Sequence, residues 1–225
     1  MSIGSFNDGL AEGIKLFRNE NYKEAIESLE KIFSLENDLE AGYHLALSYA
    51  QIQDYDKALE VFDKIITKID NKLRKMQIHL IIGYIYTLKE MYDLAEFELL
   101  DALADGVENT QIYSVLGYIY YKKGSARKGI EYLRKALALD PNSANARNSL
   151  GFIMVDSGIN IDEGIIEIEK ALEKEPENPA YLDSLGWAYF KKKDFQKSKE
   201  YLTKAFQLAP FNKDIKEHLL ELDKV

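Results

Sequence analysis

Three histidines and no cysteine are the first candidates for metal or nucleophilic chemistry in this sequence. His44, His79 and His218 lie far apart in the chain, and none has a second histidine at helical spacing beside it. A zinc site needs three or four convergent ligands, while disulfides, thiolate metal sites and cysteine nucleophiles all need cysteine. No Ser–His–Asp set is suggested by position either. The sequence therefore predicts no catalytic site, no metal site and no cofactor, and we expect that the protein is not an enzyme.

Residues 124–129 begin like a phosphate-binding loop, with a glycine at each end. Such a loop requires Lys and then Ser or Thr after its second glycine, but Ile130 follows Gly129 here. We therefore interpret the segment as a turn between two helices. The charge balance also disfavours nucleic acid, because the chain carries a net charge of −9 and phosphate contacts need clustered Lys and Arg.

The elements that position these residues follow a repeat, which is clearest between residues 110 and 143. An aromatic residue, a Leu-Gly pair and a tyrosine come first, and then a small residue, a large apolar residue, an alanine and a proline. This order is typical of a helix–turn–helix repeat of about 34 residues. The residues that carry it are Tyr113, Leu116, Gly117, Tyr120, Gly129, Leu133, Ala136 and Pro141.

Five further stretches repeat this order with substitutions. The six expected units cover residues of about 6–38, 39–72, 76–109, 110–143, 144–177 and 179–212. Residues 1–5 precede them as an N-terminal tail, and residues 213–225 follow as an amphipathic helix with Ile215, Leu219 and Leu222 on one side. Because the last repeat of such an array leaves an apolar face open, we expect this helix to cap it.

Spacing and polar residues predict some local detail. From Ala25 to Ala58 the spacing is 33 residues, but from Ala58 to Ala95 it is 37, so either longer helices or a longer loop must accommodate the extra residues near 68–74. Gly129 stands where alanine is usual and costs a helix about 1 kcal/mol, which close approach of the two helices would compensate. The residues expected to cap helices, two of them in capping-box-like pairs, are Asn21 with Glu24, Asp54, Asn160 with Glu163, and Asn178 before Pro179.

The termini and the apolar segments contain no targeting signal or membrane span. The start, Met1-Ser2-Ile3-Gly4-Ser5-Phe6, has no basic residues followed by an apolar run, so we expect no secretory signal and a cytoplasmic location. The longest apolar candidate, Ile78 to Leu88, is shorter than the ~18–20 residues of a membrane helix and contains His79 and Gly83. We therefore expect no membrane insertion.

Six tandem units of this kind resemble the tetratricopeptide repeat (TPR) family. The resemblance covers about Phe6 to Asn212, and the stretch Leu182 to Trp187 is similar to repeats of bacterial TPR proteins. It implies an all-α fold, a right-handed α-solenoid of about six TPR helix–turn–helix repeats with a C-terminal capping helix. It also implies a concave groove that is lined by the first helix of each unit and binds a protein or peptide partner.

The resemblance places particular positions in that groove. The predicted peptide-binding residues are Tyr43, Leu47, Leu80, Tyr84, Tyr118, Tyr121, Asn148, Phe152, Trp187 and Phe190. Further positions on the same helix faces are Leu10, Ile14, Phe17, Ala50, Thr87, Ser114, Val155 and Asp183. TPR domains that clamp an acidic C-terminus carry Lys, Arg and Asn at such positions. Only Asn148 matches that pattern, so we reject an acidic-tail clamp.

The apolar and aromatic character of these positions leaves two function classes open. One is an adaptor that binds an apolar or amphipathic peptide or helix in the groove. The other is a self-associating structural scaffold for a larger complex, in which the same strip pairs copies of the chain and forms a homo-oligomer. Any single ring is equally compatible with packing against neighbouring helices. A contiguous apolar strip nevertheless favours an interface over bare surface.

Overall fold

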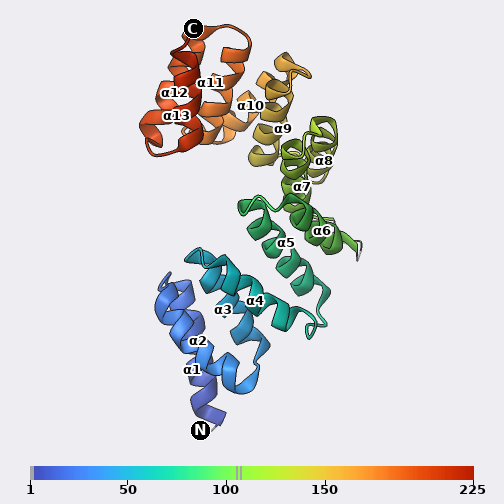
Figure 1. Ribbon diagram of the computed structural model, residues 1–225, viewed down its shortest axis with the longest axis vertical. Helices are drawn as coiled ribbons and strands as arrows, with labels where there is room; N and C mark the ends of the chain where they lie inside the picture. Colours follow the sequence, from blue (N-terminus) through green and yellow to red (C-terminus); the bar gives the residue numbers. More distant parts are fainter. Residues whose placement is uncertain (1–2, 105, 107) are drawn as a thin grey trace. The chain divides into compact units, whose positions relative to one another are not determined.

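The computed structural model describes residues 3–104, 106 and 108–225, and in these residues it contains 13 α-helices and no β-strand (Figure 1). The predicted all-α fold is thus confirmed. Met1 and Ser2 of the expected tail lie outside the described residues, and the first helix begins within that tail. The helices are α1 (Ile3–Arg18), α2 (Tyr22–Glu36), α3 (Leu39–Gln51), α4 (Tyr55–Ile66), α5 (Lys72–Leu88), α6 (Tyr92–Ala104), α7 (Thr110–Lys122), α8 (Ala126–Leu139), α9 (Ala144–Asp156), α10 (Ile161–Lys174), α11 (Pro179–Lys191), α12 (Phe195–Leu208) and α13 (Lys213–Leu222).

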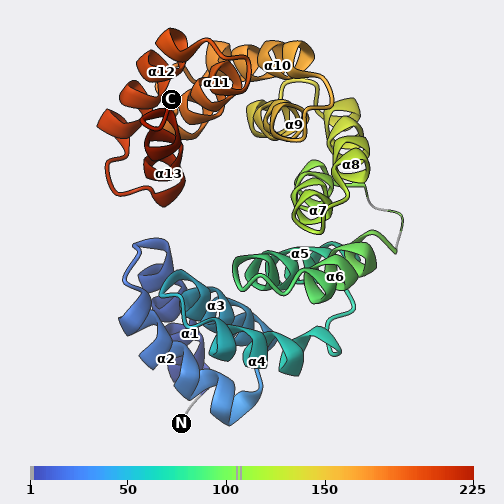
Figure 2. The same cartoon turned by 45° about the horizontal axis from the view of Figure 1, so that its top comes forward.

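The helices form two compact units, and the boundary between these units lies between residues 107 and 108. The first unit contains α1–α6 and the second contains α7–α13. In both, each odd-numbered helix up to α11 packs against the helix that follows it (Figure 2). Within the second unit, α7 also contacts α9, α9 contacts α11, and α11 contacts α13. The first helices of successive pairs therefore lie side by side there, as a shared face requires.

The extra residues between the second and third pairs lengthen a helix. Helix α5 has 17 residues, whereas α3 and α7 have 13 each. It begins at Lys72, before residue 76 where the third unit was expected to start, and the side chain of Asn71 accepts a hydrogen bond from the Arg74 N–H. Of the two alternatives, the longer helix is therefore the correct one.

Glycines allow α7 and α8 to approach closely. A Cβ added to Gly129 would lie 2.6 Å from the carbonyl oxygen of Gly117, and a Cβ added to Gly117 would lie 2.6 Å from Cγ of Leu133. Real Cβ atoms do not come this close to another heavy atom, so a side chain at Gly129 would require the helices to move apart, and one at Gly117 would require the Leu133 side chain to shift. The expected compensation for glycine in α8 is therefore confirmed.

Polar caps begin several helices as the sequence predicts. The side chains of Asp54, Asn160 and Asn178 accept hydrogen bonds from N–H groups of the first turn of α4, α10 and α11. Asn21 precedes α2, but its side chain makes no capping hydrogen bond, so the capping pair predicted there is wrong. Such caps contribute about 1 kcal/mol each.

The C-terminal helix α13 covers apolar side chains of the last helix pair. Ile215 of α13 is buried with Leu182 of α11 and Ala205 of α12, and Leu219 packs against this cluster. Helix α13 thereby extends the row of first helices in the second unit by one position, next to α11.

Candidate functional site

Five rings form a chain of contacts on α7, α9, α11 and α13 of the second unit. Tyr121 and Phe152 meet edge to face with ring centroids 6.0 Å apart, and Phe152 lies 6.5 Å from His218. His218 stacks on Trp187 at 4.3 Å, and Trp187 stacks on Phe190 at 4.9 Å. We call Tyr121, Phe152, His218, Trp187 and Phe190 the aromatic row. All five side chains are partly exposed, so the row presents apolar ring surface to solvent.

Trp187 is the most constrained ring of the aromatic row. It stacks on both His218 and Phe190, with interplanar angles of 16° and 11°. The ammonium group of Lys191 lies 4.9 Å from its ring centroid, a distance at which a cation attracts the π face. Its position is therefore set by contacts within the protein, and only part of its surface remains for a partner.

Asp156, at the end of α9, joins three successive first helices. One carboxylate oxygen accepts a hydrogen bond from Tyr121 Oη at 2.6 Å. The other accepts one from Trp187 Nε1 at 2.9 Å and lies 3.2 Å from Nζ of Lys191. Burial alone would raise the pKa of Asp156, but hydrogen bonds from Tyr121, Trp187 and Lys191 outweigh it and hold the pKa below its usual value. The pKa of Tyr121 is raised, by burial and by this hydrogen bond to Asp156.

A second carboxylate fixes the His218 ring. Nδ1 of His218 lies 2.9 and 3.0 Å from the two carboxylate oxygens of Asp183, which is buried. The wider set of predicted groove positions included Asp183, Val155 and Thr87, and the structure corrects all three because each is buried. Asp183 supports the aromatic row from beneath. Val155 belongs to the core, and Thr87 donates a hydrogen bond to the Gly83 carbonyl.

Tyr118 and Asn148 flank the aromatic row. Tyr118 of α7 is 41% exposed, and Nζ of Lys122 lies 5.7 Å from its ring centroid. Asn148 of α9 is partly buried, and its Oδ1 atom is buried without a hydrogen-bond partner in the described residues. Of the predicted residues near the row, Tyr118 therefore offers the most accessible ring.

The first unit holds the other four predicted residues, and it uses them differently. Tyr43 and Leu47 pack against the core of that unit. The guanidinium carbon of Arg74 lies 4.1 Å from the Tyr43 ring centroid, which covers one ring face. Leu80 is partly buried, whereas Tyr84 is 52% exposed. Only Tyr84 of these four therefore presents most of an apolar side chain to solvent.

Sequence reasoning missed Asp156, Lys191 and His218. Asp156 and Lys191 lie at the ends of α9 and α11, outside the positions that define the repeat signature. Charged residues are common at helix ends, so the sequence does not distinguish these two. His218 had a signal, because Asp183 and His218 are 35 residues apart, as are Asn148 and Asp183. The three occupy equivalent positions in successive first helices, which places Asp183 and His218 on adjacent helices.

The three histidines each have carboxylate partners and remain separate from one another. His44 is hydrogen-bonded to Glu40 at 3.1 Å, and His79 lies 2.8 Å from Glu98 and 3.1 Å from Asp101. Within the part of the chain that the structure describes, no group of three or more His, Asp or Glu side chains is arranged to hold a metal ion. In the same residues, no helix combines the length and the apolar character needed to cross a membrane.

Comparison with known proteins connects this geometry to a family. Residues 117–158 match a family model described as "TPR repeat", and residues 179–212 match one described as "Tetratricopeptide repeat". Residues 10–65 match the model of anaphase-promoting complex, cyclosome, subunit 3.

Two curated relatives are similar to the chain over part of their own length. BBSome complex member BBS4 of Bos taurus is 26% identical over 198 residues, which cover 88% of this chain and 37% of the relative. TPR repeat-containing protein PA4667 of Pseudomonas aeruginosa is 34% identical over 89 residues, or 40% of this chain and 15% of the relative. The chain thus spans well under half of either relative.

The fold also matches the crystal structure of PilW, a type IV pilus biogenesis factor, with a TM-score of 0.79 and 17% identity over 97% of this chain and all of that one. This likeness concerns the fold. With the repeat signature, the helix pairs and three TPR-type models in agreement, the chain is a tandem tetratricopeptide repeat protein with an all-α TPR solenoid fold.

Proposed function

We propose that this protein is a non-catalytic scaffold that binds an apolar or amphipathic peptide or helix of a partner protein through the first helices of its repeats. The observation that carries the proposal is the aromatic row. Rings from α7, α9, α11 and α13 of the second unit are partly exposed, and each contacts the next in the order Tyr121, Phe152, His218, Trp187 and Phe190. Aromatic side chains are the preferred anchors of protein interfaces, because they bury a large area at low cost in conformational entropy.

The internal contacts of the aromatic row favour binding. Trp187 and Tyr121 are already held by Asp156, and His218 is held by Asp183. A partner therefore does not have to order these side chains on binding, and each rotamer-rich side chain that is ordered on binding costs about 0.5–1.5 kcal/mol. The row thus supports recognition of apolar side chains by a prearranged surface.

The charges beside the aromatic row support an apolar partner over an acidic one. Lys191 is the cation closest to Trp187, and it forms an ion pair with Asp156 at 3.2 Å. A peptide carboxylate would have to compete with Asp156 for this ammonium group. The acidic-tail clamp that the sequence disfavours therefore gains no support from the row.

Fluorescence titration of the full chain tests the proposal. Trp187 is the only tryptophan, so its emission reports directly on the row. The probe is an uncharged amphipathic peptide with Leu and Phe on one helical face and Gln and Ser on the other. The substitutions Tyr118→Ala and Phe152→Ala together remove one ring of the aromatic row and the accessible ring beside it. Neither residue is a partner of Asp156, so the hydrogen bond between Asp156 and Trp187 is kept. We expect saturable binding by the wild type and roughly tenfold weaker binding by this double variant.

The matched control is Phe211→Ala, which removes a ring that is 90% exposed between α12 and α13 and lies outside the row. Its affinity for the peptide should equal that of the wild type. Equal affinity of the double variant and the control would refute the proposal. Circular dichroism of all variants checks that helicity is retained.

Self-association of the chain is the alternative hypothesis for the function of the same surface. Light scattering over a range of concentrations separates the two. A monomer that binds the peptide agrees with the adaptor. If the wild type forms a dimer and the Tyr118→Ala, Phe152→Ala variant does not, the surface pairs two copies of the chain. The structural-scaffold hypothesis would then replace the adaptor hypothesis.

A further inference from the structure

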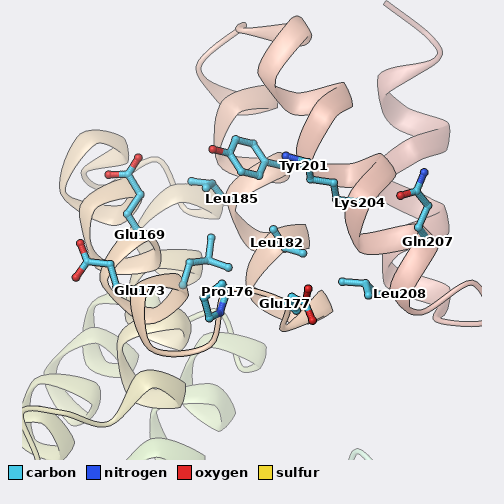
Figure 3. A pocket seen from close by; sticks show the side chains of 11 residues that line it. Glu169, Glu173, Pro176, Glu177, Leu182, Leu185, Tyr201, Lys204, Gln207 and Leu208 are labelled. Atoms are coloured by element: carbon cyan, nitrogen blue, oxygen red, sulfur yellow. The ribbon is translucent and has the colours of Figure 1, made fainter.

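A second surface of the second unit combines an apolar floor with an acidic edge. A hollow of about 660 Å³ lies between α10 and α12, with α11 beneath it (Figure 3). Leu182 and Leu185 of α11 lie at its base between the two walls, and Leu172 and Tyr201 add partly buried apolar surface. Leu208, which is 50% exposed, forms part of the α12 wall. We call this hollow the α10–α12 groove, and it shares no residue with the aromatic row.

Carboxylates line one side of the α10–α12 groove. Glu169 and Glu173 project from α10, and Glu177 follows the helix (Figure 3). Glu173 and Glu177 are exposed, and neither forms an ion pair with any residue that the structure describes. A second hollow of about 580 Å³ shares Pro176 and Glu177 with the groove and adds Glu175. The carboxylates thus continue along the edge.

The charge on the α12 wall does not neutralise this edge. Lys204 lies in that wall, but its ammonium group pairs with Glu200 at 2.7 Å. That hydrogen bond and the charge of Glu200 raise the pKa of Lys204. The carbonyl end of α10 also points toward Glu175 and Pro176, and a helix C-terminus carries partial negative charge. The residues that line the groove therefore include three carboxylates and one ammonium group beside apolar surface, and Lys174 lies next to the carboxylates in the last turn of α10.

We propose that the α10–α12 groove binds a segment of a partner protein in which an apolar side chain is flanked by Lys or Arg. The apolar side chain packs on Leu172 and Leu208, above the buried Leu182, and the basic side chains pair with Glu173 and Glu177. Charge complementarity selects this occupant, because an acidic segment would meet only carboxylates on the edge. The scaffold then has two binding surfaces of different chemistry, one aromatic and one acidic.

Methyl and amide NMR of the full chain locates such binding. The probe is a twelve-residue blocked peptide with central Leu and Phe and three Lys on either side, and the reference peptide has Glu in place of each Lys. We expect the Lys peptide to shift the methyl signals of Leu172, Leu182 and Leu208 at low salt. The Glu peptide should shift none of them, and 0.5 M NaCl should weaken the Lys peptide because exposed charges are then screened.

Glu173→Gln with Glu177→Gln removes the charges and keeps the size of both side chains. We expect roughly fivefold weaker binding. The control is Glu131→Gln with Glu217→Gln, which changes the net charge equally at two exposed glutamates that line neither hollow. This control should bind like the wild type. Leu208→Ala should weaken binding of the Lys peptide at both salt concentrations.

Three results would overturn the proposal. One is equal affinity of the two double variants. Another is shifts that fall on Phe152 and Trp187 in place of the groove leucines. The third is a concentration-dependent dimer of the free chain that perturbs the same leucines, because a second copy would then occupy the groove. None of these results depends on whether the aromatic row binds its own peptide.

Discussion

Replacing Asp156 by asparagine tests whether one carboxylate holds the aromatic row in place. Its oxygens lie 2.6 Å from Tyr121 Oη, 2.9 Å from Trp187 Nε1 and 3.2 Å from Lys191 Nζ. Asparagine offers one oxygen, and its NH2 group would face a donor. A hydrogen bond to a charged group contributes about 1.5–3 kcal/mol, and an asparagine can keep one of them. We therefore expect Asp156→Asn to lower the free energy of unfolding by about 2–4 kcal/mol.

Urea unfolding followed by two signals measures this change. Trp187 emission reports on the row, because Nε1 donates to Asp156 and the chain has no other tryptophan. Circular dichroism reports on all helices. We expect the fluorescence midpoint to fall and native emission to change, because the indole N–H loses a charged acceptor. A repeat protein does not always unfold in one step, so comparing the two midpoints shows whether the loss is confined to the second unit.

The effect should depend on pH with a definite sign. The pKa of Asp156 is lower in the folded protein than in the unfolded chain, so its stabilisation is present above the unfolded value of about 3.9 and is lost as pH falls toward the folded value. Asp156→Asn should therefore flatten the acid side of the stability curve. Asp156→Asn should not abolish the dependence of stability on pH, because Glu167 contributes to it as well. Burial opposes ionisation of Glu167, but hydrogen bonds from Lys170 and Arg147 outweigh burial and lower its pKa.

Asp162→Asn is the control for the Asp156 substitution. The Asp162 side chain is 77% exposed and pairs with Lys192 at 2.7 Å. Exposed ion pairs contribute about 0–1 kcal/mol, so this variant should unfold almost like the wild type. If Asp156→Asn is no less stable than Asp162→Asn and its emission is unchanged, the carboxylate does not hold the row.

Two further predictions concern the small residues at the helix contacts, and both are checked by urea unfolding. Gly129→Ala should lower stability by about 1–2 kcal/mol despite better helix propensity, because its Cβ would lie 2.6 Å from the Gly117 oxygen; a gain in stability would show that α7 and α8 can separate freely. Ser198→Ala, at the equivalent position of α12, should raise stability by up to about 1 kcal/mol, since its buried hydroxyl has no hydrogen-bond partner in the described residues; a loss would indicate an unseen partner for that hydroxyl.

The sequence predicts the helix face of each groove residue, but it does not predict how exposed the side chain is. The position of a residue in the repeat determines the face on which it lies. It does not determine which neighbouring side chains cover it. Tyr43 and Tyr84 occupy the same face of α3 and α5, yet Arg74 covers the ring of Tyr43 while Tyr84 is largely exposed. Core packing of the Tyr43 ring against Phe62 and the long side chain of Arg74 together produce this difference, and the repeat pattern does not predict where Arg74 lies.

The sequence by itself determined the features that repeat along the chain. Apolar residues at helical spacing and small residues at fixed positions dictate helix pairs that pack closely, and Gly117 and Gly129 meet as that pattern requires. These are local consequences of spacing and volume, so they can be derived from one unit and extended to the others.

The tertiary structure alone decided which side chains from different repeats meet. Asp156 contacts Tyr121, Trp187 and Lys191, which are 31 to 35 residues away in the chain. Such contacts depend on how each first helix is seated beside the next, and small differences in helix length or packing move a side-chain tip by several ångströms. The repeat therefore determines which helix face a residue occupies. The packing of α7, α9, α11 and α13 determines which aromatic side chains on that face are held by hydrogen bonds and which remain exposed.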